Sequence, residues 1–185
     1  SSSSLLMVSS ITLYVYANLL NSIKIEEHFF LIIFFYYNLL FFLFNKSIFF
    51  KIKIFYGDSG STFIGFIFSW VLIYYAHPNQ SFIHPVLAIW CITLPIYDFL
   101  FVIFHRLFKK INPLMPDNNH IHHILLRKYK SQTLTLSLII LLSILLNLFG
   151  FIIFYFLGSF ICFLSYIFLF ILYYFFLKNL MINYN

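Results

Sequence analysis

The residues that could do chemistry in this sequence gather in one polar segment beyond its midpoint. His120, His122 and His123 lie within four positions, Asp117 comes shortly before them, and basic residues lie on both sides. Histidine can donate hydrogen bonds to phosphate oxygens near neutral pH, and lysine or arginine neutralises phosphate charge. The segment therefore favours an anionic, phosphate-bearing substrate.

A zinc site is the alternative for three closely spaced histidines. On a helix, however, the i, i+3 spacing places only His120 and His123 on one side, and no cysteine is near them in the sequence. An isolated His-x-His-His sequence is a weak zinc signal. The phosphate interpretation is preferred, and zinc remains the alternative.

A second candidate site lies at Asp58, which Gly57 and Gly60 flank just before a long apolar stretch. Mg²⁺ is usually held by one or two carboxylates together with substrate phosphate oxygens. Asp58 is therefore a candidate ligand for Mg²⁺, or for Mn²⁺ in its place. The other interpretation is that Asp58 only stabilises the N-terminus of the helix that follows.

A third carboxylate, Asp98, lies inside an apolar stretch, in the sequence Pro95-Ile96-Tyr97-Asp98. A charged residue within a membrane span costs about 2.5 to 3.5 kcal/mol even on lenient scales, so it marks a functional or a tightly paired site. The paired alternatives are Arg106 and a backbone donor. Asp98 is therefore a possible functional intramembrane residue.

The stretch that follows has an amphipathic pattern. Apolar residues recur with helical spacing at Phe104, Leu107, Phe108 and Ile111. We expect this helix to lie at the membrane surface, where its basic side could attract either lipid headgroups or a substrate. The residues on the basic side are His105, Arg106, Lys109 and Lys110.

The candidate sites must be positioned by membrane helices. Of the 185 residues, 63% are hydrophobic and only 9% are charged, which excludes an ordinary soluble domain. A helix needs about 20 mostly apolar residues to cross a bilayer. The sequence predicts an all-α, polytopic transmembrane helix bundle of about six spans, at roughly 5–23, 29–44, 61–76, 85–104, 134–157 and 160–177.

The basic residues orient these spans. If the spans alternate in direction, loops 45–60 and 105–133 lie on the same side as the C-terminal tail, and this side carries ten of the eleven lysines and arginines. Basic residues concentrate on the cytoplasmic side of membrane proteins. We therefore expect a multi-pass protein of the cytoplasmic membrane whose two candidate loops face the cytoplasm.

Three segments, in order, resemble a known enzyme family. They are Gly57–Phe66 (GDSGSTFIGF), Pro95–Asp98 (PIYD) and Pro116–His123 (PDNNHIHH). In this order and on these spans they closely resemble the polyprenyl-phosphate N-acetylhexosamine-1-phosphate transferases, and residues 1–185 correspond to the C-terminal part of that domain. The His-x-His-His form favours the N-acetylglucosamine branch of the family.

The resemblance implies transfer of N-acetylglucosamine 1-phosphate from UDP-N-acetylglucosamine to undecaprenyl phosphate in the lipid bilayer, with release of UMP. This reaction is the first membrane step of cell-surface polysaccharide synthesis, and no nucleic-acid partner is expected. The resemblance makes Asp58 a catalytic metal ligand and gives His122 and His123 catalytic roles. The implied substrate-binding residues are Arg106, Asp117, His120, His122 and His123.

The sequence also departs from the family pattern. Asn118 follows Asp117 where many relatives have arginine, which removes a side chain that grips phosphate through two hydrogen bonds. The family's paired aspartates and its Asn/Asp-Gly-x-Asp-Gly stretch are not in this sequence, so we expect a fragment that is inactive alone. The alternatives are a transporter or scaffold subunit, with Asp98 as an ion relay, and a decayed remnant of the transferase.

Overall fold

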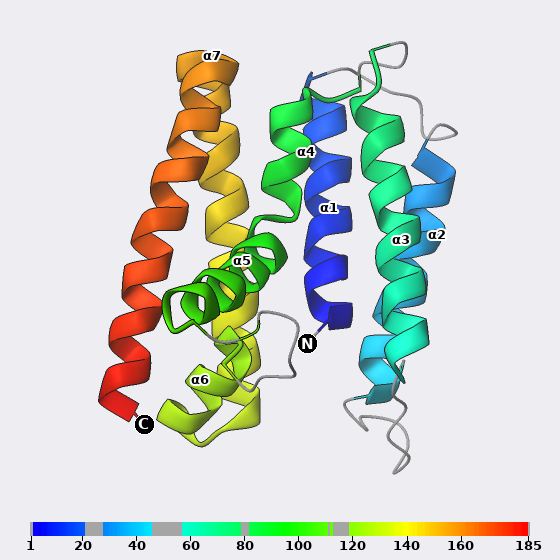
Figure 1. The fold of residues 1–185 in the computed structure, drawn as a ribbon. Coiled ribbons are helices and arrows are strands. Elements are labelled where there is room, and N and C mark those ends of the chain that lie inside the picture. Colours follow the sequence, from blue (N-terminus) through cyan, green and yellow to red (C-terminus); the bar gives the residue numbers. More distant parts are fainter. Residues whose placement is uncertain are drawn as a thin grey trace. The chain divides into compact units, whose positions relative to one another are not determined.

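The computed structural model describes residues 2–20, 28–45, 57–78, 82–110, 112 and 119–184, with the side chains of residues 2, 45, 58, 183 and 184 excepted. All secondary-structure elements of this described part are helices (Figure 1). They form two compact units, Ser1–Cys91 and Ile92–Asn185. The predicted all-α class is confirmed, and each unit is described by itself.

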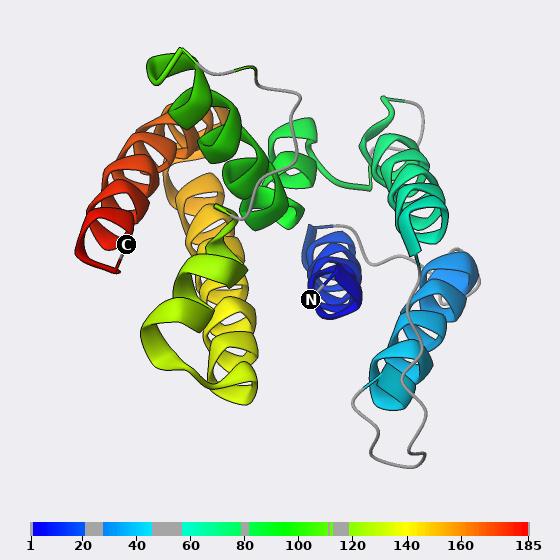
Figure 2. The same ribbon diagram turned by 60° about the horizontal axis from the view of Figure 1, so that its bottom comes forward.

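The first unit is built around α1. Its helices are α1 (Ser2–Leu20), α2 (Phe29–Asn45), α3 (Gly57–Ala76) and α4 (Pro85–Cys91). Helix α1 contacts the other three, and α3 also contacts α4 (Figures 1 and 2). On α1 the small polar residues Ser9 and Ser10 are buried beside Leu13 and Ala17. Small residues allow helices within a membrane to approach closely.

His28, directly before α2, joins three helices of this unit. Its Nδ1 lies 2.9 Å from the Tyr75 hydroxyl on α3, and its Nε2 lies 3.3 Å from Nδ2 of Asn18 on α1. The ring is fully buried and also contacts Tyr14 edge-on. The C-terminal ends of α1 and α3 are therefore held beside the start of α2. Neighbouring spans that run in opposite directions have their ends arranged in this way.

The structure corrects the predicted span 85–104, which is interrupted at Ile92. The chain forms α4 up to Cys91 and a new helix, α5, over Thr93–Phe108. Pro95 explains the break, because proline lacks a backbone N–H and its ring clashes with the carbonyl four residues earlier. Pro95 lies in the first turn of α5, where helical N–H groups have no partner in the helix.

The second unit consists of α5, α6 (Ile121–Tyr129) and α7 (Gln132–Tyr184), and α7 contacts both of the others. Helix α7 is broken at Gly158, whose backbone angles are φ 80° and ψ 177°. The chain reverses there, so that arms 132–157 and 159–184 lie side by side (Figures 1 and 2). The Cys162 thiol donates across the hairpin to the Gly150 carbonyl, at 3.4 Å. These arms correspond to the predicted spans 134–157 and 160–177.

The chain is a membrane protein. By length and composition, α1, α3 and α7 could each cross a membrane, and the bent pair α4 and α5 counts as a fourth span if it is taken together. Helix α2 is apolar but has 17 residues, a length of about 26 Å against a hydrocarbon core of about 30 Å. The predicted six spans are reached only if α2 is included and the arms of α7 are counted separately.

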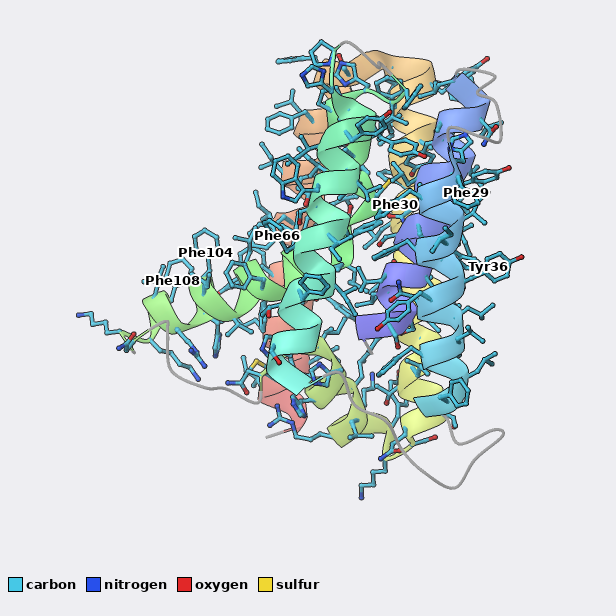
Figure 3. All side chains as sticks on the ribbon, turned by 90° about the vertical axis from the view of Figure 1, so that its right-hand side faces the viewer. Phe29, Phe30, Tyr36, Phe66, Phe104 and Phe108 are labelled. Carbon is cyan, nitrogen blue, oxygen red and sulfur yellow. The ribbon has the colours of Figure 1, made fainter. Side chains whose placement is uncertain are left out.

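Large aromatic side chains point outward from the helices of both units. Figure 3 shows Phe29, Phe30 and Tyr36 projecting from α2 and Phe66 from α3, all of them exposed. A surface with this much exposed apolar area suits contact with lipid rather than with water. Lipid-facing aromatic residues therefore account for much of the unusual composition.

Candidate functional site

The three histidines of the polar segment lie at the start of α6. His120 has extended backbone angles, φ −64° and ψ 151°, and directly precedes the helix. Its carbonyl accepts hydrogen bonds from the His123 and Ile124 amides, at 2.9 and 3.1 Å. The first turn of α6 therefore carries His122 and His123, and His120 is its N-cap.

Helix α6 is held on the second unit by its apolar side. Ile121, Ile124 and Leu125 are buried, and the helix contacts α7. The helix ends at Tyr129, and the next residue, Lys130, adopts the left-handed conformation with φ 52° and donates its N–H to the Leu126 carbonyl at 2.9 Å. Many helices end in this way, with a residue in the left-handed conformation directly after the last turn. The short helix is therefore fixed along one side and at its end.

Asp98 from α5 binds the start of α6 through both carboxylate oxygens. Oδ2 lies 3.0 Å from Nδ1 of His120, and Oδ1 accepts the Ile121 backbone N–H at 2.7 Å. The Asp98 side chain is 17% exposed. A carboxylate at a helix N-terminus satisfies an unbonded N–H and interacts favourably with the helix dipole. Of the two partners expected for Asp98, a backbone donor is confirmed, and His120 is an additional one.

The three imidazole rings lie in a row. The His120 and His122 ring centroids are 5.8 Å apart, and those of His122 and His123 are 4.1 Å apart. Burial, with a further contribution from His123, lowers the pKa of His122 from 6.5 to about 4. At neutral pH the His122 ring is therefore neutral and can donate one hydrogen bond and accept another.

Positive charge is concentrated in the last turn of α6, and Arg127 reaches back from there to the start of the helix. Arg127 is exposed, and its Nη2 lies 3.5 Å from Oδ1 of Asn119, the residue before the histidines. The Lys128 ammonium lies 5.0 Å from the centroid of the Tyr129 ring. Lys130 is also exposed. Such a group of cations can neutralise the charge of a bound phosphate ester.

The end of α5 differs from the amphipathic pattern that the sequence suggests. His105 and Arg106 are buried, with Arg106 only 5% exposed, whereas Phe108 on the apolar side is 74% exposed. Phe104 and Phe108 project from the same side of the helix (Figure 3). The expected exposed basic side is thus found only at Lys109 and Lys110. The reason is packing within this unit, where α5 lies on α7 and the His105 ring stacks on Phe101.

Asp58 lies in the first turn of α3, in the first unit, and its side chain is outside the described part. Gly57 begins this helix with φ 66°, a left-handed conformation that favours glycine. Asp117 lies wholly outside the described residues. The structure therefore places Asp58 on a helix N-terminus, as expected, while the roles expected for Asp58 and Asp117 stay predictions.

The described histidines do not form the zinc site that was the alternative. Across the described residues, no group of three or more histidine, cysteine, aspartate or glutamate side chains could hold a metal ion. Nδ1 of His120 is already bonded to Asp98. The Mg²⁺ ligand role expected for Asp58 stays a prediction.

Sequence reasoning did not find two of these contacts. The bond between His120 and Asp98 joins residues 22 positions apart, and the buried His28 contact with Tyr75 joins residues 47 apart. A usable signal for the first is the carboxylate near the end of one helix and the histidine at the start of the next. No local signal exists for the second.

Comparison with known proteins supports the resemblance seen in the motifs. The chain is 38% identical over 100 residues to the undecaprenyl-phosphate alpha-N-acetylglucosaminyl 1-phosphate transferase of Yersinia pestis, covering 54% of this chain and 27% of that protein. The protein of the same name from Escherichia coli strain K12 is 40% identical over 77 residues, which are 42% of this chain and 21% of the relative. That from Pasteurella multocida is 38% identical over 89 residues, covering 47% of this chain and 25% of the relative.

The chain spans about a quarter of the length of these curated relatives. No family model matches the chain. No solved structure matches it significantly. The three motifs and the matched segments together relate this chain to the bacterial undecaprenyl-phosphate alpha-N-acetylglucosaminyl 1-phosphate transferases.

Proposed function

We propose that the complete gene product transfers N-acetylglucosamine 1-phosphate from UDP-N-acetylglucosamine to undecaprenyl phosphate and releases UMP. Residues 1–185 would form the C-terminal part of this enzyme. The name shared by the relatives supports both the transferred group and the lipid acceptor. The observation that carries the proposal is the histidine-bearing first turn of α6, which Asp98 binds, on a short helix whose last turn carries Arg127 and Lys128.

The geometry of this turn suits the diphosphate of a nucleotide sugar. His122 is neutral at pH 7 because burial lowers its pKa to about 4, and a bound anion would favour its protonated form. Arg127 and Lys128 supply permanent positive charge on the same short helix. Hydrogen-bond donors and cations of this kind stabilise the negative charge that phosphoryl transfer leaves on phosphate oxygens.

A metal ion belongs to this proposal. Mg²⁺, or Mn²⁺ in its place, would be held in part by the Asp58 carboxylate and would stabilise charge on the diphosphate. The support for this role is the position of Asp58, directly after Gly57 at the start of α3. The histidines are assigned to the nucleotide sugar and not to the metal.

The proposed location is the cytoplasmic membrane, with both candidate loops on the cytoplasmic side. Within the second unit, α6 and the C-terminal end of α7 lie at the same end of the helical hairpin (Figure 1). This end carries Arg127, Lys128, Lys130 and Lys178. Their concentration at one end supports a cytoplasmic assignment by the positive-inside rule. The proposed reaction would be the first membrane step of cell-surface polysaccharide synthesis.

The experiment uses membranes that contain the complete gene product. Radiolabelled UDP-N-acetylglucosamine, undecaprenyl phosphate and Mg²⁺ are supplied, and both the lipid-linked sugar and free UMP are measured. We expect the two products to form in equal amounts, because one UMP leaves for each sugar phosphate transferred. Release of UDP in place of UMP, or no labelled lipid, would contradict the proposal.

The transporter alternative is less well supported. It requires Asp98 as an ion relay, but both oxygens of this carboxylate are bonded, one to a histidine ring and one to a backbone amide. A carboxylate that caps a helix is a fixed structural element rather than an open ion site. No described contact favours transport over transfer of a phosphate-bearing group.

A further inference from the structure

We propose that Asp98 is a positioning residue that holds His120 and the first turn of α6, and through them the rings of His122 and His123, against a phosphate-bearing substrate. This inference rests on the proposed function and deepens it. It assigns Asp98 neither to the metal nor to ion movement. The consequence is that the histidine turn is oriented from α5, a different helix.

The two bonds of Asp98 fix both a ring and a backbone. Its Oδ2 is bonded to the His120 ring, and its Oδ1 to the Ile121 N–H, at 3.0 and 2.7 Å. Hydrogen bonds to an ionised carboxylate are stronger than those between neutral groups. Because the two acceptors belong to one rigid group, the ring and the helix start cannot move independently while both bonds remain.

The residues next to Asp98 on α5 are packed tightly and hold the carboxylate in place. Tyr97 and Phe101, in the adjacent turns of α5, are fully buried. The centroid of the Tyr97 ring lies 4.9 Å from that of Tyr166 and 5.5 Å from that of Tyr173, both on the second arm of α7. The Tyr97 hydroxyl also donates a hydrogen bond to the Tyr166 carbonyl. The position of Asp98 is therefore set by the packing of α5 on α7.

The apolar side of helix α6 packs against the same unit. Ile121 and Ile124 are 4% and 1% exposed, and α6 contacts α7. These apolar contacts set where α6 lies but are not directional. Asp98 adds the directional restraint at the N-terminus, where the histidines are. His122 and His123 follow directly, one and two residues after the capped Ile121 amide.

The arrangement predicts which kinetic quantity depends on Asp98. Partners that orient the ligands of a metal site typically change metal affinity or activity by about 10- to 100-fold when they are removed, and we expect an effect of similar size for a partner that orients substrate-binding histidines. Asp98→Ala should therefore raise the KM for UDP-N-acetylglucosamine by about 10- to 100-fold. The Mg²⁺ concentration that gives half-maximal activity should stay unchanged, because both oxygens of Asp98 are used within the protein.

Two further variants separate positioning from a general loss of structure. Asp98→Asn keeps the size of the side chain and one acceptor oxygen, so it should recover part of the lost affinity. Phe99→Ala is the matched control, since Phe99 is the next residue on α5, is 61% exposed and points away from the core. It should keep the wild-type KM.

Hydrogen exchange gives a readout that does not depend on activity. The Ile121 amide is at the first position of α6, where no carbonyl within the helix can accept it, so Asp98 is its acceptor. In the complete gene product, Asp98→Ala should lose protection at this amide, whereas Phe99→Ala should keep it. Asp98→Asn keeps one acceptor oxygen and should lose only part of this protection, and this partial loss is measured if the alanine variant does not insert into the membrane.

Two results would overturn the inference. The first is an Asp98→Ala protein with wild-type KM and wild-type Ile121 protection. The second is a variant in which only the Mg²⁺ requirement rises. If the wild-type protein itself forms no lipid-linked sugar, the proposed function fails, while the exchange experiment still decides whether Asp98 holds the turn.

Discussion

Acidification should destabilise this protein through His122 in particular. Burial is the main cause that lowers the pKa of His122 to about 4 from 6.5, and His123 adds to it. In the unfolded chain the ring returns to water and to its ordinary pKa of about 6.5. The folded state thus favours the neutral ring, and a proton binds more readily after unfolding.

The sign and size of the effect follow from these two values. A folded pKa below the unfolded one means that the stabilisation is fully present above about pH 6.5 and is lost as the pH falls toward about pH 4. One pKa unit corresponds to about 1.4 kcal/mol. Because His122 is only partly buried, solvent screens part of this effect. Between about pH 7.5 and about pH 5, His122 should therefore lower the free energy of unfolding by at most about 2 kcal/mol.

The assay compares wild type with His122→Gln, which keeps a polar side chain but has no titrating ring. Denaturant unfolding in neutral detergent is measured at about pH 7.5 and about pH 5. The wild-type protein should lose up to about 2 kcal/mol more than the variant over this interval. An equal loss in both proteins would refute a neutral, partly buried His122, because the variant lacks the ring that takes up the proton on unfolding.

Three further predictions concern other parts of the molecule. Asp58→Asn in the complete gene product should abolish Mg²⁺-dependent formation of the lipid-linked sugar without changing membrane insertion; normal activity would reject Asp58 as a metal ligand. Gly158→Ala, at a φ of 80°, should destabilise the hairpin of α7 by about 1 to 3 kcal/mol in thermal unfolding, and Gly65→Ala, within α3 and with open space around it, is the control. His28→Ala should cost about 2 to 4 kcal/mol, because it removes two hydrogen bonds at a buried position; His84→Ala, at an exposed position, should cost much less.

Composition and local pattern were enough to predict the helical class and the positions of most helices. The gap between the predicted spans 134–157 and 160–177 coincides with the break at Gly158, where glycine tolerates a left-handed backbone without strain. The start of α3 at Gly57 is likewise a local property. Such features depend on a few neighbouring residues, so that the sequence carries them directly.

Features that depend on packing were not predictable in the same way. The apolar run of 85–104 hides the break that Pro95 produces at Ile92. The basic side of α5 is partly buried because of its neighbours, which periodicity within one helix does not reveal. The sequence does not identify the bonding partner of Asp98, because it does not say which helix start comes within 3.0 Å of this carboxylate.

In the proposed enzyme, the histidine turn of α6 binds the nucleotide sugar. The most direct measurement is chemical footprinting of His120, His122 and His123 by mass spectrometry in membranes containing the complete gene product, with and without UDP-N-acetylglucosamine. The claim predicts that the nucleotide sugar protects these histidines, while exposed His77 and His84 react equally in both samples. Unchanged reactivity of all three histidines at a saturating concentration of the nucleotide sugar would contradict it.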